Sequence, residues 1–101
     1  MESDKSTNEI IETGIGSVVK IKIIKILATG KKFHTIYGIQ KRTNLKRNDI
    51  KRNIKDLIAI GWIREQKLNT VLYYLNTDDI YVEKLVRYFK EVGYLDDIEY
   101  N

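Results

Sequence analysis

Cysteine and proline are absent from the sequence, and histidine occurs once. Without cysteine the chain has neither a disulfide framework nor a thiolate metal site, and one histidine is too few for a zinc centre. No apolar run approaches the roughly 20 residues needed to cross a bilayer, and the N-terminus MESDKSTNE does not have the layout of a signal peptide. We expect a soluble, cytoplasmic protein that needs no cofactor and does not contact a membrane.

The sequence also lacks the residue combinations of common catalytic sites. It has no carboxylate pair suited to acid–base chemistry, no nucleophile beside a base, no glycine-rich phosphate loop and no metal cluster. Helix capping and solvation of the C-terminal tail explain the acids Asp78, Asp79, Asp96 and Asp97. We therefore expect a protein that is not an enzyme, with His34 as a partly buried structural residue. No site for a small-molecule effector is evident.

Charge is unevenly distributed along the 101 residues, which are enough for one domain. Residues 1–16 have a net charge of −3, and residues 68–101 have a net charge of −4. Between them, residues 17–67 contain fourteen Lys and Arg against three acids, a net charge of +11. A basic middle block with acidic ends indicates that one surface attracts a polyanion, and duplex DNA is the natural candidate.

The strongest pattern in the chain lies in the segment Leu45–Ile63. At about 100° per residue, a helix here gathers four apolar side chains on one face: Ile50, Ile54, Leu57 and Ile58. The opposite arc has five basic side chains between Lys46 and Lys55 against a single acid, Asp49. A basic outer face often marks only a solvated surface helix, but such helices usually mix charges of both signs. We therefore predict a DNA-reading helix over Lys46–Ile60, which Gly61 ends.

The expected DNA contacts of this helix come from its outward residues, which are Lys46, Arg47, Asn48, Lys51, Arg52 and Lys55. Guanidinium, ammonium and amide groups can pair with base edges in the major groove, and all three can also pair with phosphates. We expect base contacts from Arg47, Asn48, Lys51 and Arg52.

The preceding residues predict two packing elements. Residues 17–29 fit a strand over Val19–Ile23, which alternates with period two, or a helix that Ser17 caps and Gly30 ends. We favour the helix because its length is typical of one and because its apolar residues recur at period 3.6: Val18, Ile21, Ile23, Ile24 and Leu27. After a short extended piece at Phe33 and His34, Thr35 caps a helix over Ile36–Arg42. Thr43–Leu45 then form a turn, with Leu45 as an apolar plug.

A β-hairpin is expected after Gly61. Its strands are Trp62–Lys67 and Thr70–Asn76, and its turn lies at Leu68 and Asn69, where asparagine tolerates a left-handed backbone. Strand alternation places Ile63, Tyr73 and Leu75 on the inner face. The remaining polar side chains at this hairpin either face solvent or contact DNA phosphates or a minor groove; the candidates are Arg64, Lys67 and Asn69.

The two ends of the chain are expected to differ in order. Residues 1–16 predict a flexible arm or a short, weakly held helix. Asn76 or Thr77 caps a last helix that has Asp78 and Asp79 in its first turn and extends to about Val92. The apolar residues of this helix cover more than half of its circumference, which is more than one core-facing stripe requires and implies a second partner.

From Val18 to Leu75 the chain resembles the winged helix-turn-helix family. The residues that support the resemblance are Ile39, Leu45, Ile50, Ile54, Leu57, Gly61 and Ile63. The resemblance implies a mainly α fold with a small β-hairpin (α+β), and it is closest to small dimeric transcriptional regulators of archaea and of their viruses and plasmids. It also implies contacts from the helix before the turn, through Tyr37, Gln40, Lys41 and Arg42, and a homodimer interface at Tyr81, Leu85, Tyr88, Phe89 and Val92.

Together these predictions divide the chain into a flexible arm (1–16), a winged helix-turn-helix domain (17–76) and a C-terminal dimerisation helix with its tail (77–101). The leading interpretation is a homodimer that binds double-stranded DNA sequence-specifically and regulates transcription. Two alternatives remain open. One is a plasmid partition or replication-origin protein that coats DNA, and the other is a winged helix that binds another protein.

Overall fold

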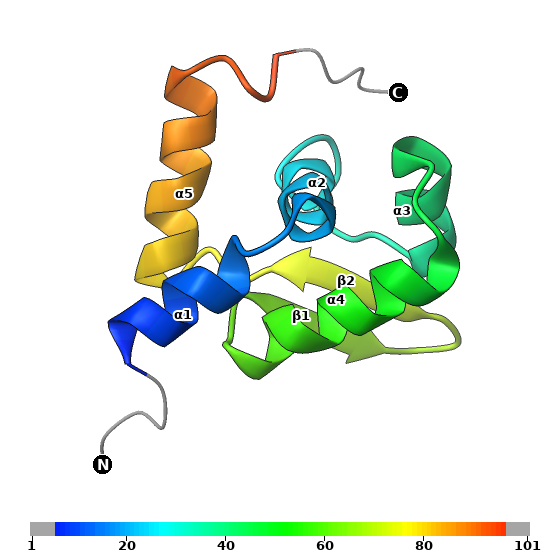
Figure 1. The fold of residues 1–101 in the computed structure, drawn as a ribbon. Coiled ribbons are helices and arrows are strands. Elements are labelled where there is room, and N and C mark those ends of the chain that lie inside the picture. The colour runs from blue at the N-terminus through cyan, green and yellow to red at the C-terminus, as the bar shows by residue number, and fades with distance from the viewer. Residues whose placement is uncertain (1–5, 97–101) are drawn as a thin grey trace.

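The computed structural model describes residues 6–96 and shows a mainly α fold with one two-stranded antiparallel hairpin (Figure 1). The elements in chain order are α1 (Thr7–Gly14), α2 (Val18–Leu27), α3 (Ile36–Thr43), α4 (Arg47–Ala59), β1 (Ile63–Lys67), β2 (Val71–Leu75) and α5 (Ile80–Glu91). Figure 1 shows α1 and α5 on one side of the molecule, and α3 with the turn of the hairpin on the other. The predicted fold class is confirmed.

The segment after Ser17 is a helix, as the capping pattern predicts. The Ser17 hydroxyl accepts a hydrogen bond from the Lys20 amide at 3.1 Å, which satisfies one of the free amides at the start of α2. The predicted apolar face is correct except at one position. Val18 is 68% exposed, and Ile26, which is buried, faces the core instead.

The core includes the junction of α2, α3 and α4. Five of its side chains are at most 1% exposed, and these are Ile23, Ile24, Ile39, Ile50 and Leu57. The predicted plug Leu45 is half-buried against this core, at the turn between α3 and α4. Asn44, at the end of α3, adopts the left-handed conformation (φ 62°) and donates its amide to the Gln40 carbonyl, which turns the chain towards α4.

The N-terminal segment is a short helix, one of the two forms that the sequence left open. Residues Thr7–Gly14 form α1, which begins with a capping box in which the side chains of Ser6 and Glu9 each accept a backbone amide. The last residue, Gly14, is buried against the indole of Trp62 so closely that an added Cβ would lie 2.2 Å from the ring. This contact requires glycine and packs α1 on the rest of the fold. Residues 1–5 lie outside the described residues.

The hairpin is present as predicted, but its connection is one residue longer, and a third segment is paired with it. Ile63 pairs with Leu75 and Lys67 with Val71, while His34 and Tyr73 exchange backbone hydrogen bonds of 2.9 and 2.7 Å. The predicted left-handed backbone at Asn69 is wrong. Within residues 6–96 the only residue other than glycine with positive φ is Asn44. Three residues, 68–70, connect the strands, so the turn does not depend on the strained conformation of a two-residue loop.

The last helix begins later than predicted. Asp79, not Asn76 or Thr77, is its N-cap, because its carboxylate accepts the amides of Tyr81 and Val82. Asn76 instead donates its side-chain amide to the Gly61 carbonyl at 3.0 Å, which ties the end of β2 to the end of α4. Asp78 and Asp79 therefore precede the first turn of α5.

Candidate nucleic-acid interface

The outward face of α4 is polar and almost wholly cationic. Its inward face buries Ile50, Asn53, Ile54 and Leu57. All six side chains predicted to contact DNA are exposed, and these are Lys46, Arg47, Asn48, Lys51, Arg52 and Lys55. The helix therefore has an apolar face that holds it in the domain and an opposite face whose donors are available to a ligand.

An ion pair lies within this cationic face. The Asp49 carboxylate accepts a hydrogen bond from an Arg52 Nη at 2.7 Å, one helical turn along α4. The Arg52 side chain remains 67% exposed, so it can reach a ligand while the pair limits its rotamers. Asn53 donates its side-chain amide to the Asp49 carbonyl at 2.7 Å. This buried amide was not predicted, because an isolated asparagine between polar residues has no distinguishing pattern.

The N-terminus of α4 differs from that of the other described helices. Side chains of Ser6, Ser17, Thr35 and Asp79 cap α1, α2, α3 and α5, whereas the N-cap of α4 is Lys46 and makes no side-chain hydrogen bond. The first-turn amides of α4 thus have no side-chain cap, although the Asp49 carboxylate, which pairs with Arg52, lies in the same turn. Such a terminus favours an anion.

A partly buried ion pair joins α2 and α4. Lys20 Nζ of α2 lies 3.1 Å from an Asp56 oxygen, and the Lys20 side chain is only 11% exposed. The structure places Lys20 between α2 and α4, where its positive charge offsets that of the half-exposed Asp56 carboxylate.

The residues predicted on α3 are unequally accessible. Tyr37 is 67% exposed, Lys41 and Arg42 are exposed, and Gln40 is half-buried. The Lys41 ammonium lies 6.0 Å from the centre of the Tyr37 ring, at the outer limit of a cation–π contact. Arg42 lies near His34, and its positive charge contributes to lowering the pKa of the His34 imidazole.

The hairpin places cations beside the start of α4. Arg64, Lys67 and Asn69 are all exposed. Lys67 Nζ lies 3.9 Å from a Glu65 oxygen, so the Glu65 carboxylate partly offsets the charge of Lys67. Burial raises the pKa of the Tyr73 hydroxyl, as does nearby Glu65, while nearby Arg47 opposes the rise. Tyr73 is thus within electrostatic range of both the hairpin and the first turn of α4. Figure 1 shows the turn of the hairpin on the same side of the molecule as the start of α4.

His34 is structural, as predicted, and more deeply buried than expected. It is 1% exposed, and its Nε2 lies 2.9 Å from the Lys31 carbonyl. Since a carbonyl only accepts, Nε2 carries the proton and donates it. Burial lowers the pKa of His34 and the Lys31 carbonyl raises it, while the charges of Arg42 and Lys31 lower it further.

Helix α5 lies on the side of the molecule away from α3 (Figure 1). Of the five residues predicted for a dimer interface, Tyr88 and Val92 are more than half exposed and Tyr81 and Leu85 are half-buried. Phe89 does not fit this prediction. It is 5% exposed and its ring packs edge-on against Tyr94 at 4.9 Å, so it belongs to the core of its own protomer.

Within residues 6–96, no three histidine, cysteine or acidic side chains are grouped so that they could hold a metal ion. In the same part of the chain, no helix combines the length and the apolar character needed to span a membrane.

Two solved structures share this fold at low sequence identity. One is a possible HxlR family transcriptional factor from Thermoplasma volcanium, with a TM-score of 0.66 and 17% identity, and the match covers 97% of this chain and 88% of that one. The other is an ArsR family transcriptional regulator, with a TM-score of 0.60 and 15% identity, and the match covers 91% of this chain and 92% of that one. No protein-family model and no curated protein sequence matches the chain. The likeness shows that the chain has the winged helix-turn-helix fold of these regulators, with α3 and α4 as the helix-turn-helix and the hairpin as the wing.

Proposed function

We propose that this protein binds double-stranded DNA sequence-specifically as a homodimer and regulates transcription. The observation that carries the proposal is the outward face of α4, where five cations and one amide are exposed and the one acid is paired to Arg52. One similar solved structure is described as a possible transcriptional factor and another as a transcriptional regulator. This surface does not support an enzymatic function, because it groups cations without a nucleophile or a general base.

The proposed complex places α4 in the major groove, with its uncapped N-terminus towards the phosphates. Arg47 and Arg52 are suited to guanine O6 and N7, and Asn48 to adenine N6 and N7. Phosphate contacts come from the more peripheral cations, which are Lys41, Arg42, Lys46, Lys55 and Lys67. The wing follows α4 directly in the chain, so it reaches the backbone beside the same groove.

The proposed homodimer uses α5, whose outward side chains Ile80, Tyr88 and Val92 are each more than half exposed. Apolar side chains that recur along one helix face and are left in water favour association. A twofold axis presents two α4 helices to two half-sites, so the target is expected to be a palindrome with half-sites about one helical turn apart.

The experiment is a salt titration of duplex binding, followed by fluorescence anisotropy. Each phosphate contact contributes about −0.9 to the slope of log K against log salt, so a dimer with six to ten contacts gives a slope of roughly −5 to −9. Lys55→Gln should reduce the magnitude of the slope by about 2 per dimer, one contact from each α4. The matched control is Lys90→Gln on α5, which should leave the slope unchanged. Failure to bind duplex DNA at low salt, or equal slopes for both variants, would contradict the proposal.

A further inference from the structure

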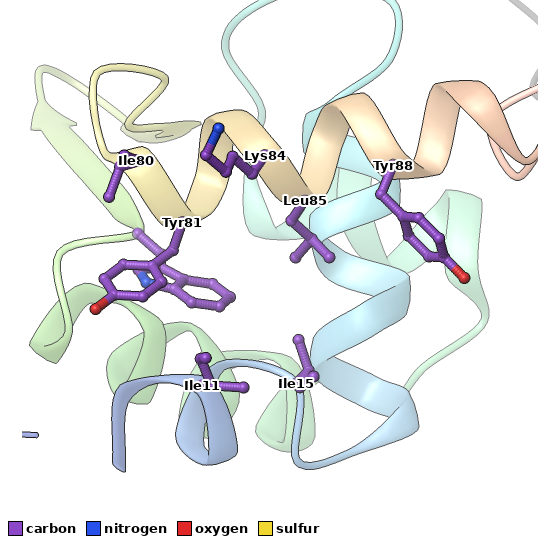
Figure 2. Close-up of a pocket in the computed structure, with 8 residues that line it drawn as sticks. Ile11, Ile15, Ile80, Tyr81, Lys84, Leu85 and Tyr88 are labelled. Atoms are coloured by element: carbon purple, nitrogen blue, oxygen red, sulfur yellow. The ribbon is translucent and has the colours of Figure 1, made fainter. Parts of the chain in front are cut away.

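Large apolar side chains are exposed on both sides of the molecule. Six of them lie on α1, on α5 or near the connection from α1 to α2, and these are Ile11, Ile15, Val18, Ile80, Tyr88 and Val92. Figure 2 shows four of the six around a groove between α1 and α5. Two others, Tyr37 and Leu68, lie on the elements proposed to contact DNA. The sequence assigned Leu68 only to the turn of the hairpin, so its exposure has no explanation yet.

Leu68 is separate from the apolar core. Its side chain is 64% exposed, and it belongs neither to the core nor to the partly buried side chains that pack on the core. None of residues 68–70 has a positive φ, and leucine is not one of the residues that favour turns. Neither packing nor turn formation therefore requires a leucine at this position. Because single exposed leucines are common on protein surfaces, the surroundings of Leu68 decide whether it has a role.

The tip of the wing, residues 68–70, is held in place by strand pairing. Lys67 pairs with Val71, so the antiparallel ladder continues up to the residue that precedes Leu68. The Leu68 amide donates a hydrogen bond to the Thr70 carbonyl at 3.3 Å, which closes the connection. Figure 1 shows this tip on the same side of the molecule as α3 and the start of α4. The paired strands therefore present Leu68 on the side where DNA is proposed to bind.

The tip of the wing has no charged residue. Leu68, Asn69 and Thr70 are all exposed, and the cations of the wing, Arg64 and Lys67, precede them on β1. Phosphates attract cations, whereas the minor groove presents hydrogen-bond acceptors on its floor. An asparagine amide can donate to these acceptors, and a leucine can insert between adjacent base pairs. The composition of the tip therefore suits the minor groove better than the phosphates.

We propose that Leu68 is an apolar wedge that enters the minor groove beside the α4 site and partly unstacks one base step. This inference rests on the proposed DNA binding and adds a deformation of the duplex to it. Wedges of this kind kink DNA by roughly 20–90°. Pyrimidine–purine steps are the most easily unstacked, so the duplexes that bind best have such a step under each wing.

The test measures bending and unstacking of the tightest-binding duplex that the wild-type protein selects from a random library. Circularly permuted fragments of about 150 base pairs, one persistence length of DNA, report the bend through the electrophoretic mobility of their complexes. The fluorescent base 2-aminopurine, placed at successive positions along the flanks of the site, becomes brighter where its step is unstacked. The wild-type protein should bend the fragment and brighten 2-aminopurine at one step in each flank.

Leu68→Ala removes most of the wedge. It should abolish the 2-aminopurine signal, reduce the bend and weaken binding to the selected duplex by about 10-fold or more. Leu68→Phe retains an apolar wedge and should keep both signals. The control on the same wing is Arg64→Gln, which should reduce the salt slope and leave the unstacking unchanged. Because both positions are exposed, an unchanged circular dichroism spectrum confirms that each variant is folded.

Leu68→Lys distinguishes the groove from the phosphates. If the tip contacts phosphates, the added cation tightens binding and steepens the salt slope by about 0.9 per protomer, which would overturn the wedge. If Leu68 is the wedge, this variant loses the unstacking and binds the selected duplex less tightly.

The remaining outcomes separate the wedge from the proposed function. A wild-type protein that binds no duplex at low salt would overturn both. If the wild type binds but leaves the duplex straight and stacked, or if Leu68→Ala keeps both signals, the DNA-binding function stands and the wedge is wrong.

Discussion

Two ion-paired arginines in this protein have the same local chemistry but different surroundings. Arg52 on α4 pairs with Asp49 three residues earlier, and Arg87 on α5 pairs with Glu83 four residues earlier. Both pairs are exposed, so each contributes at most about 1 kcal/mol to stability. Replacing either arginine should therefore cost similar, small amounts of stability. Their effects on DNA binding should differ because only Arg52 lies on the face of α4.

Arg52→Ala is expected to weaken binding to a specific site by about 10- to 100-fold, since a good base contact contributes roughly 1–3 kcal/mol of discrimination. Binding to unrelated duplexes should fall much less, because only one charge per protomer is lost. Arg87→Ala should change neither the affinity for the specific site nor the affinity for unrelated duplexes. Anisotropy titrations with the selected site and with a scrambled duplex measure the difference. Equal losses on both duplexes would assign Arg52 to a phosphate instead of a base.

His34 predicts a pH dependence of stability. Burial lowers its pKa in the folded state below the ordinary value of 6.5, so near pH 6 the unfolded chain binds more protons than the folded one. The stabilising contribution of neutral His34 is therefore complete above about pH 6.5 and is lost as pH falls towards the folded pKa, with a slope of at most about 1.4 kcal/mol per pH unit.

Urea unfolding between about pH 5.5 and pH 7.5 measures this slope, in a range where the chain has no other side chain with an ordinary pKa. His34→Gln retains a side-chain amide that can donate to the Lys31 carbonyl and does not titrate. This variant should be less stable at pH 7.5, and its stability should vary less with pH. An identical pH profile for the two proteins would show that His34 does not control the dependence.

At the scale of elements, the sequence correctly predicted the helices whose boundaries depend on local chemistry. Ser17 and Thr35 cap α2 and α3, and Gly61 follows α4, because hydroxyl caps and a glycine with positive φ satisfy helix ends locally. Where two local signals competed, the prediction was less accurate. Asn76 resembles a cap for α5, but in the structure it bonds to the Gly61 carbonyl, a partner distant in sequence.

Helix α1 shows which contacts the sequence could not predict. A short polar segment with two glycines is typical of an arm, and the contact that packs it most closely on the fold is Gly14 against Trp62. That contact joins residues 48 positions apart, so no local pattern reveals it. The same applies to Lys20, whose partner Asp56 lies on another helix. The outward face of α4 was predictable because both of its faces follow from one helical period.

The cations of the wing are expected to contribute affinity and little specificity. Arg64→Gln together with Lys67→Gln should weaken binding to every duplex by a similar factor and reduce the magnitude of the salt slope by up to about 2 per protomer. Since Glu65 partly offsets Lys67, Arg64→Gln alone should have the larger effect of the two single changes. A salt titration of each variant checks this. A change in the preferred sequence, with the salt slope intact, would contradict the phosphate role.

At the scale of the whole molecule, exposed cations and exposed apolar residues are concentrated on different sides. The N-terminus of α4, α3 and the tip of the wing lie on one side, and α1 with α5 lies on the other (Figure 1). Cations dominate the first side and exposed apolar residues the second. This division accounts for the basic middle block and acidic ends of the sequence, because the cations of α3, α4 and the wing all lie within residues 17–67.

Tyr88→Asp is expected to convert the proposed dimer into a monomer. Tyr88 is 57% exposed, so the change should leave the protomer folded while placing a charge in the interface. Sedimentation velocity should show a single monomeric species, and affinity for a palindromic site should fall by at least about 100-fold because only one half-site is then held at a time. A dimer that survives the substitution would place the interface elsewhere.

The most direct test of DNA recognition by α4 is selection of bound sequences from a random duplex library at near-physiological salt, where non-specific binding is suppressed. The wild-type protein should recover a palindrome with half-sites about one helical turn apart. Asn48→Ala should recover the same spacing with at least one base position relaxed. Recovery of no motif from the wild type, with binding that disappears as salt rises, would contradict sequence-specific recognition and favour DNA coating.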